Sequence, residues 1–392
     1  MPKHLATSPV PPRRRRWPLP LVAVGLLVGV GGLVVLDPSD DPNVEATGTT
    51  LAGESEPVAV CTQASLEDRA GLVLVVGLPG VTEATDPLVD RLVQAGVGGV
   101  MLRDDNILDE EQAAALVAGL RDRLGEHLLV AIDDEGGRVT AMGELDEPIH
   151  SARTLARLGA DEAEAFGAEL GELARSIDVD WVFAPVVDLD AGPASGVIGD
   201  RSFSDDPAVV TEVAGAFATG LHREGVAVTL KHFPGHGSAG GDPHLGVAVS
   251  DSTLDELAAA DLLPFSALID DGAEAVMVGH VAYPEIWGDQ PASLVSGAYE
   301  LLREQGFDGV AITDALGMGA VHAQYGFDQA PAMAIGAGAD AVLVNQGDQI
   351  DVLHAGLVDA VREGRLDEGR LDEAAGRVLE LRGQPSDGIV CS

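Results

Sequence analysis

The segment 207–232, PAVVTEVAGAFATGLHREGVAVTLKH, contains in one place the pattern that decides the fold. Its first part, 207–223, has the apolar spacing of an amphipathic helix, and its second part, 226–232, is a β-branched run that ends in Lys231 and His232. Helix-like and strand-like runs alternate in this way from Gly71 onward. Apolar strands separated by helices are typical of a parallel sheet that is covered on both faces.

Eight runs share this strand-like character: 72–78, 99–102, 128–133, 181–189, 226–232, 275–281, 309–314 and 341–344. The helical patterns are 110–124, 161–177, 207–223, 254–269 and 296–305, with a last helix at 371–381 that closes the end of the domain. Eight strands over about 270 residues predict an α/β fold with a single (β/α)8 TIM-type barrel. No GxGxxG motif follows the first strand, which argues against an open dinucleotide-binding sheet.

The chain is strongly acidic. Its 392 residues include 23 Lys and Arg against 64 Asp and Glu, which gives a net charge of −41. Such a chain repels a polyanion, so the composition argues against a nucleic-acid partner. Hydrophobic residues make up 46% and recur in blocks, enough for a sizeable core. Lys3 and Lys231 are the only lysines. Lysine therefore stands at position 231 either by chance or because this position requires an ammonium group.

The N-terminal part of the chain is basic and then apolar. Residues 19–36, LPLVAVGLLVGVGGLVVL, are uncharged, and this run nearly spans a hydrocarbon core of about 30 Å. Arg13–Arg16 precede it, so the positive-inside rule assigns 1–18 to the cytoplasm. We therefore expect a transmembrane signal anchor and an extracytoplasmic catalytic domain. A cleaved signal peptide and a secreted protein are the alternative.

Residues 37–60 are rich in Asp, Pro, Gly, Thr and Glu and predict a flexible linker. The domain proper then covers 61–392, and we expect it to be a monomer. Cys61 and Cys391, the only cysteines, lie near its two ends. In an oxidising compartment a disulfide between them is favoured over two free thiols.

Charged and imidazole side chains come at the ends of five successive predicted strands. These residues are Asp133, Asp188, Lys231, His232, His280 and Asp314. In a barrel the carboxyl ends of all strands converge on one mouth, so these side chains are expected to share a pocket.

Two segments carry most of the predicted chemistry. Residues 231–244, KHFPGHGSAGGDPH, contain three histidines, and Asp242 lies close enough to His244 to orient its imidazole for proton transfer. Asp314 follows an apolar strand, where a carboxylate can act as nucleophile, base or metal ligand.

Together, KHFPGHG with its downstream D-x-H, IDxEGGRV, APVVDLD, DRSF, PASL and TDALGM resemble family 3 glycoside hydrolases, in particular the β-N-acetylhexosaminidase branch. The likeness runs in order from about Leu72 to the last helix. It implies a retaining exo-β-N-acetylglucosaminidase without a cofactor or metal. The implied substrates are peptidoglycan fragments or chitooligosaccharides.

The resemblance also implies a role for each matching residue. Asp314 matches the nucleophile, and His244 with Asp242 matches the general acid/base dyad, where most retaining glycosidases use a second carboxylate. The other matching residues are substrate contacts at Asp133, Arg201, Lys231 and His232, and supporting residues at Glu135, Arg138, Asp188, His236 and His280.

The sequence departs from the family pattern at two positions. Ala141 stands where the family commonly has Arg, and Pro243 lies inside the dyad, where it restricts Asp242 to extended conformations. Three other functions remain as alternatives: a phosphorylase, a metal-dependent hydrolase built from His232, His236, His244 and Asp314, and an inactive sugar-binding module.

Overall fold

A computed structural model describes residues 64–143, 145, 150–237, 239–241 and 246–386. The predicted anchor and linker, both cysteines, and the Asp242–His244 dyad lie outside these residues. Among the residues that the structure describes, no helix is both long and apolar enough to cross a membrane.

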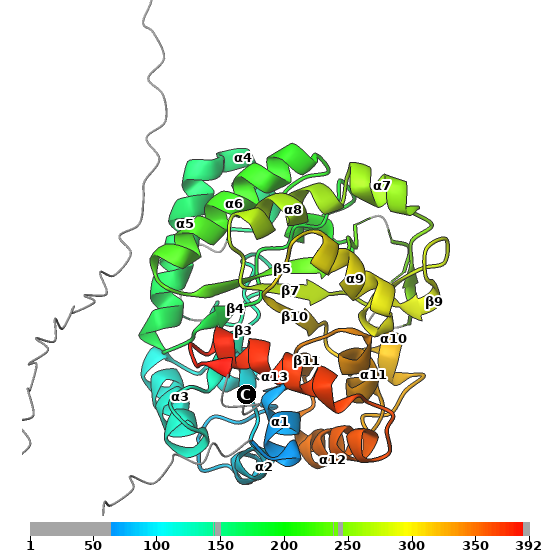
Figure 1. Ribbon diagram of the computed structural model, residues 1–392. Coiled ribbons are helices and arrows are strands. Elements are labelled where there is room, and N and C mark those ends of the chain that lie inside the picture. Colours follow the sequence, from blue (N-terminus) through cyan, green and yellow to red (C-terminus); the bar gives the residue numbers. More distant parts are fainter. Residues whose placement is uncertain (1–63, 144, 146–149, 238, 242–245, 387–392) are drawn as a thin grey trace, which may run out of the picture. The chain divides into compact units, whose positions relative to one another are not determined.

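The centre of the domain is an eight-stranded parallel sheet that nearly closes on itself (Figure 1). Its strands are β1 (Leu74–Gly77), β2 (Gly99–Leu102), β3 (Leu129–Ile132), β4 (Trp181–Val182), β5 (Ala227–Phe233), β7 (Ala275–Val278), β10 (Val310–Thr313) and β11 (Val342–Val344). The order is β10-β7-β5-β4-β3-β2-β1-β11, and a parallel bridge between Ile312 and Ala341 joins the two edges. The predicted α/β barrel is therefore confirmed, with all eight strands near their expected places.

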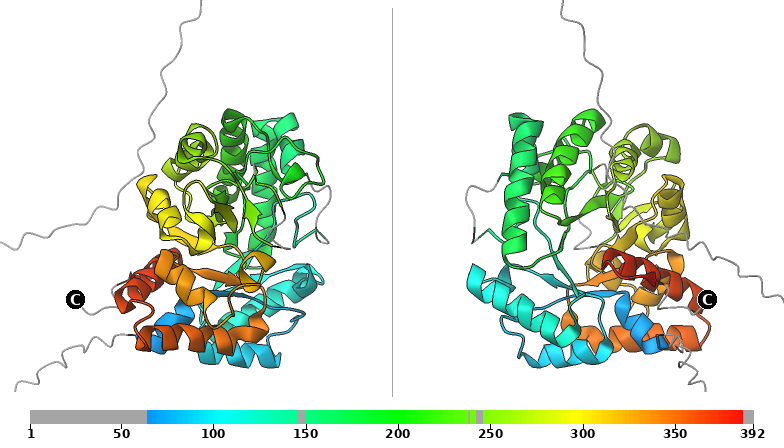
Figure 2. Two further views of the ribbon diagram at one scale, coloured as in Figure 1. Left: turned by 90° about the vertical axis from the view of Figure 1, so that its right-hand side faces the viewer. Right: turned by 60° about the vertical axis from the view of Figure 1, so that its left-hand side comes forward.

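Helices lie outside the strands in each view of the domain (Figures 1 and 2). They are α1 (Leu66–Leu72), α2 (Pro87–Ala95), α3 (Glu110–Leu124), α4 (Ala152–Leu158), α5 (Ala160–Ser176), α6 (Pro207–Arg223), α7 (Leu254–Ala259), α8 (Leu262–Asp270), α9 (Ser296–Glu304), α10 (Gly319–His322), α11 (Ala330–Ala337), α12 (Ile350–Arg362) and α13 (Glu368–Leu381). The prediction of one helix over 254–269 was wrong, because α7 ends at Ala259 and α8 begins at Leu262. Pro264 explains the break, since a residue without an N–H fits only in the first turn of a helix.

Two strands differ from their predicted bounds in ways that matter for the site. β4 ends at Val182, well short of 189, and Pro185 has no N–H to donate to a longer ladder. β5 extends to Phe233, so Lys231 and His232 lie inside the strand and not at its end. A small second sheet of β6 (Ala248–Val249), β8 (Val281–Tyr283) and β9 (Gly288–Pro291) was not predicted.

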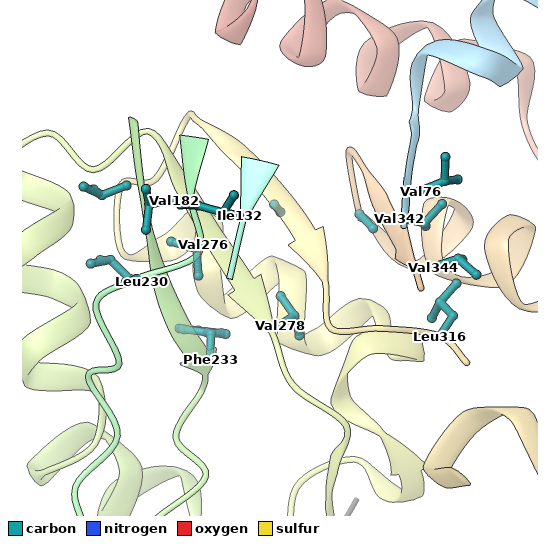
Figure 3. Close-up of a cluster of buried hydrophobic side chains, with 14 of the residues drawn as sticks. Val76, Ile132, Val182, Leu230, Phe233, Val276, Val278, Leu316, Val342 and Val344 are labelled. Atoms are coloured by element: carbon teal, nitrogen blue, oxygen red, sulfur yellow. The ribbon is translucent and has the colours of Figure 1, made fainter. Parts of the chain in front are cut away.

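Side chains of the barrel strands alternate between two apolar clusters. Val75, Met101 and Met277 belong to the cluster inside the barrel. The neighbouring positions, among them Val76 and Val276, belong to the larger cluster shared with the helices (Figure 3). Each fully buried aliphatic side chain contributes about 1.5–3 kcal/mol to folding, so both clusters stabilise the barrel that carries the site.

The last helix, α13, is held to the barrel by a buried carboxylate. Asp340, which is 0% exposed, lies just before β11 and pairs with Arg303 of α9 at 2.5 Å. The same carboxylate pairs with Arg370 and Arg377 of α13 at 2.7 and 3.1 Å. Val378 of α13 joins the apolar cluster inside the barrel, which agrees with the predicted closing role of this helix.

Candidate active site

A cavity of about 560 Å³ is lined largely by residues from the carboxyl ends of the barrel strands. The polar side chains that line it are Arg103, Asp104, Asp133, Arg138, Thr140, Arg201, Lys231, His232, His236, Asp314 and Asn345. Met101, Met277, Met318 and Leu343 form apolar parts of its wall. The cavity therefore combines several charged groups with an apolar surface, as sites for small polar ligands do.

Glu135 lies outside the cavity lining and pairs with two cations that line the cavity, Arg201 and Lys231. Its side chain is 3% exposed, and its two oxygens accept hydrogen bonds from Arg201 Nε and Nη2, both at 2.7 Å. Lys231 Nζ lies 2.6 Å from Glu135 Oε1 and 2.5 Å from Asp133 Oδ1. Burial alone would raise the pKa of Glu135, but Arg201 and Lys231 hold it well below its usual range.

Both cations stay charged although they are buried. Burial would lower the pKa of Arg201 and Lys231, but the nearby carboxylates of Glu135 and Asp133 raise it in each case. Lys231 has three N–H donors, and the two carboxylates account for two of them. No third partner of Lys231 Nζ is found within the described ranges, and Lys231 lines the cavity.

The turn after β3 that carries these acids is shaped by glycine and by Asp134. Gly136 and Gly137 have φ values of 77° and 61°, a region that disfavours residues with a Cβ. A Cβ on Gly136 would also lie 2.4 Å from the carbonyl oxygen of His150. Asp134 Oδ2 accepts hydrogen bonds from Thr140 Oγ1 and from the Ala141 and Met142 amides at 2.9–3.0 Å.

Arg138 fixes the neighbouring loop that carries Arg201. Its guanidinium bonds Asp200 at 2.8 Å and three consecutive backbone carbonyls, those of residues 196–198, at 2.7–3.0 Å. Arg201 follows this loop directly, so Arg138 positions Arg201 through its Nε and Nη2 donors.

Asp188 lies behind the cavity and holds two histidines. Its Oδ2 bonds His232 Nδ1 at 2.7 Å, and its Oδ1 accepts the backbone amide of His236 at 2.7 Å. Burial would raise the pKa of Asp188, but His232 and His236 lower it. Burial lowers the pKa of His236 and so favours its neutral form, and its Nε2 has no hydrogen-bond partner among the described residues.

Asp314 directly follows β10 and lines the cavity. Its Oδ1 accepts the Ala315 amide at 2.7 Å. Burial alone would raise the pKa of Asp314, but His280, His232, the Ala315 amide and Lys231 lower it to about 2. The carboxylate is therefore ionised and able to attack an electrophile over the whole physiological pH range.

The structure brings together most of the predicted site residues. Asp133, Arg138, Arg201, Lys231, His232, His236 and Asp314 line one cavity. Three predicted residues lie outside its lining: Glu135 and Asp188 are buried behind it, and His280 bonds Ser293 Oγ at 2.7 Å and the Ala315 carbonyl at 3.0 Å. His280 therefore contacts the turn that carries Asp314.

Asn345, which was not predicted, lines the cavity directly after β11. The signal was present, because Asn345 is a polar residue at the end of an apolar strand, as Asp314 is. Within the described ranges, no three His, Cys, Asp or Glu side chains are arranged so that they could hold a metal ion.

Comparison with known proteins identifies relatives along nearly the whole chain. Residues 66–381 match the glycosyl hydrolase family 3 N terminal domain. The chain is 34% identical over 388 residues to the beta-hexosaminidase LpqI of Mycobacterium tuberculosis, covering 93% of this chain and 98% of that protein. It is 37% identical over 292 residues to a beta-hexosaminidase of Stenotrophomonas maltophilia, covering 72% of this chain and 86% of that protein.

Solved structures agree with these relatives. A family 3 glycosyl hydrolase from Mycobacterium smegmatis superposes with a TM-score of 0.75 at 38% identity and covers 81% of this chain and 97% of that chain. A family 3 beta-N-acetylglucosaminidase from a Paenibacillus species superposes with a TM-score of 0.76 at 33% identity and covers 82% of this chain and 62% of that chain. This chain therefore belongs to glycosyl hydrolase family 3.

Proposed function

We propose that this protein is a retaining exo-β-N-acetylglucosaminidase that removes terminal β-linked N-acetylglucosamine from peptidoglycan fragments or chitooligosaccharides. The observation that carries the proposal is the ionised Asp314 carboxylate in a cavity it shares with Asp133, Arg201, Lys231 and His232. The relatives named beta-hexosaminidase support the same activity.

The first step of the proposed reaction is displacement at the anomeric carbon. Asp314 attacks C1, the bond between C1 and the glycosidic oxygen breaks, and the departing oxygen takes a proton from His244. The product is a glycosyl ester on Asp314. A carboxylate with a pKa of about 2 suits this step, because it is ionised before substrate arrives and is a good leaving group later.

The second step releases the sugar. His244, now neutral and oriented by Asp242, takes a proton from water, whose oxygen attacks C1 as the bond to Asp314 breaks. Two inversions give net retention, so the β-anomer forms first. Asp133, Arg201, Lys231 and His232, which all line the cavity, hold the sugar hydroxyls meanwhile.

Turnover of 4-nitrophenyl N-acetyl-β-D-glucosaminide, with the product followed by NMR, tests the proposal. We expect β-N-acetylglucosamine as the first product, at a rate that is independent of added phosphate. First appearance of the α-anomer would contradict the double displacement, and formation of a sugar 1-phosphate would instead identify a phosphorylase. The His244→Ala and Asp242→Ala variants test the dyad, and wild-type rates in both would remove it from the mechanism.

We also propose that residues 19–36 anchor the protein in the membrane with its catalytic domain outside the cytoplasm. The uncharged run of 18 residues after Arg13–Arg16 supports this arrangement. Carbonate extraction and N-terminal sequencing of the protein from its native membrane test it. A mature chain that begins after residue 36 would show a cleaved signal peptide instead.

A further inference from the structure

Asn345 occupies a rigid position beside the turn that carries Asp314. The residue follows β11, whose neighbour β10 ends just before Asp314. The Leu316 amide of that turn donates to the carbonyl oxygen of Leu343 on β11 at 2.9 Å. On the other side, β1 packs so closely that a Cβ on Gly77 would lie 2.6 Å from the Asn345 carbonyl oxygen. The backbone of Asn345 is therefore fixed beside the turn that carries Asp314.

The side-chain amide of Asn345 makes no hydrogen bond within the described part of the chain. Its Oδ1 is buried and has no partner there, although the residue lines the cavity. A buried polar group without a partner destabilises the protein, so such a group at a cavity wall is suited to a ligand that satisfies it. A carboxamide offers both a donor and an acceptor, and it can exchange them by turning about its terminal bond.

The position of Asn345 selects which part of a sugar it can reach. Asp314 attacks C1 in the proposed reaction, so the substituent on the adjacent C2 lies next to the Asp314 turn. On N-acetylglucosamine that substituent is an acetamide, with one N–H donor, one carbonyl acceptor and one methyl group. Leu343 and Met318 line the same cavity and supply an apolar surface for a methyl.

We infer that the Asn345 side-chain amide binds the 2-acetamido group of the substrate and sets the preference for N-acetylated sugars over sugars with a 2-hydroxyl. This inference rests on the proposed function and assigns one residue to its specificity. Asn345 is a specificity-determining residue, since it contacts a part of the substrate that distinguishes one sugar from another.

The test compares two glycosides in wild type and in the Asn345→Ala and Asn345→Leu variants. The substrates are 4-nitrophenyl N-acetyl-β-D-glucosaminide and 4-nitrophenyl β-D-glucopyranoside, which differ only at C2. We expect kcat/KM for the acetamido substrate to fall about 10- to 100-fold, because the amide pairing is lost. We expect kcat/KM for the glucoside to change less than about 3-fold, since it lacks the acetamide.

Gln346 offers a matched control. Its buried side-chain oxygen also lacks a partner among the described residues, but Gln346 does not belong to the cavity lining. The Gln346→Ala variant should therefore change the two rates together and leave their ratio at the wild-type value. An equal loss on both substrates in the Asn345 variants, or no loss on either, would overturn the inference.

Binding of the free sugars separates this inference from the proposed function. Affinities for N-acetylglucosamine and glucose are measured by NMR titration of the intact chain, and they need no turnover. A wild-type preference for N-acetylglucosamine that disappears in both Asn345 variants supports the inference even if neither glycoside is hydrolysed. Equal affinities of wild type for the two sugars would overturn it even if both glycosides are hydrolysed.

Discussion

Replacement of Glu135 by Gln tests whether the buried ion network holds the site together. Glu135 makes two bonds to Arg201 and one to Lys231, all at 2.6–2.7 Å, and its side chain is 3% exposed. Removing one partner of a buried ion pair costs about 3–5 kcal/mol, because the opposite charge stays buried. We expect this loss in the free energy of unfolding of Glu135→Gln at pH 7, together with a fall in kcat/KM as Arg201 and Lys231 lose their position.

The pH dependence of that loss identifies its cause. Since the folded pKa of Glu135 is depressed, its contribution to stability is complete above the unfolded pKa of about 4.3 and is lost as pH falls toward the folded value. The difference between wild type and Glu135→Gln should therefore be constant from pH 7 to pH 5. Below about pH 4 it should shrink by roughly 1.4 kcal/mol per pH unit.

Urea unfolding of the full-length protein, followed by fluorescence at each pH, measures this difference. Asp351→Asn is the matched control, because Asp351 and Arg91 form an ion pair whose side chains are 67% and 37% exposed. An exposed pair of this kind contributes at most about 1 kcal/mol. A loss in Glu135→Gln as small as in the control, or one that stays unchanged down to pH 3, would refute the ion-network argument.

Three further predictions follow from other parts of the molecule. Asp314→Asn should lower kcat at least about 1,000-fold while the protein remains folded, because the nucleophile is gone; kinetics with the 4-nitrophenyl substrate check this, and substantial residual turnover would assign the role elsewhere. Since the pKa of Asp314 is about 2, titration of this residue should not lower kcat/KM between pH 4 and pH 7. If kcat/KM of the wild-type enzyme does fall with pH in that range, the titrating group is a different residue. Asp340→Ala should lower the unfolding free energy by about 3–5 kcal/mol, because it removes the buried carboxylate that Arg303, Arg370 and Arg377 share, and among the described residues only Arg370 and Arg377 have another carboxylate partner, Glu373. We expect kcat of the folded protein to stay at the wild-type value, and an unchanged urea midpoint would contradict the predicted loss of stability.

The fold was predictable because parallel strands that are covered on both faces are largely apolar. The prediction for 99–102 matches β2 residue for residue, since nothing polar interrupts this strand. The small second sheet escaped prediction for the opposite reason. β6 has only two residues, and β9 is largely polar and exposed, so neither carries an apolar pattern. The break between α7 and α8 was marked by Pro264, but the apolar spacing continues across it.

Part of the cavity lining could be predicted from the sequence, but the depth at which each residue is buried could not. Charged residues at strand ends identified Asp133 and Asp314, because barrel geometry brings such ends together. No pattern in the sequence separates Asp133, which lines the cavity, from Glu135, which lies two residues later and is buried behind it. That difference arises from the turn at Gly136 and Gly137, and from the two cations that distant segments bring to Glu135.

The electrostatics of the cavity differ from those of the whole chain, and this has a kinetic consequence. With a net charge of −41, the acidic side chains repel one another. Salt screens this repulsion and should therefore raise the free energy of unfolding of the domain. In the cavity, by contrast, Asp133 and Glu135 are balanced by Lys231 and Arg201. A neutral glycoside is not steered by a field, so its kcat/KM should stay constant as salt raises the unfolding free energy. An anionic fragment must instead approach through the negative field of the chain, so its kcat/KM should rise with salt. Parallel salt profiles for a neutral and an anionic substrate would mean that this field does not reach the mouth of the barrel.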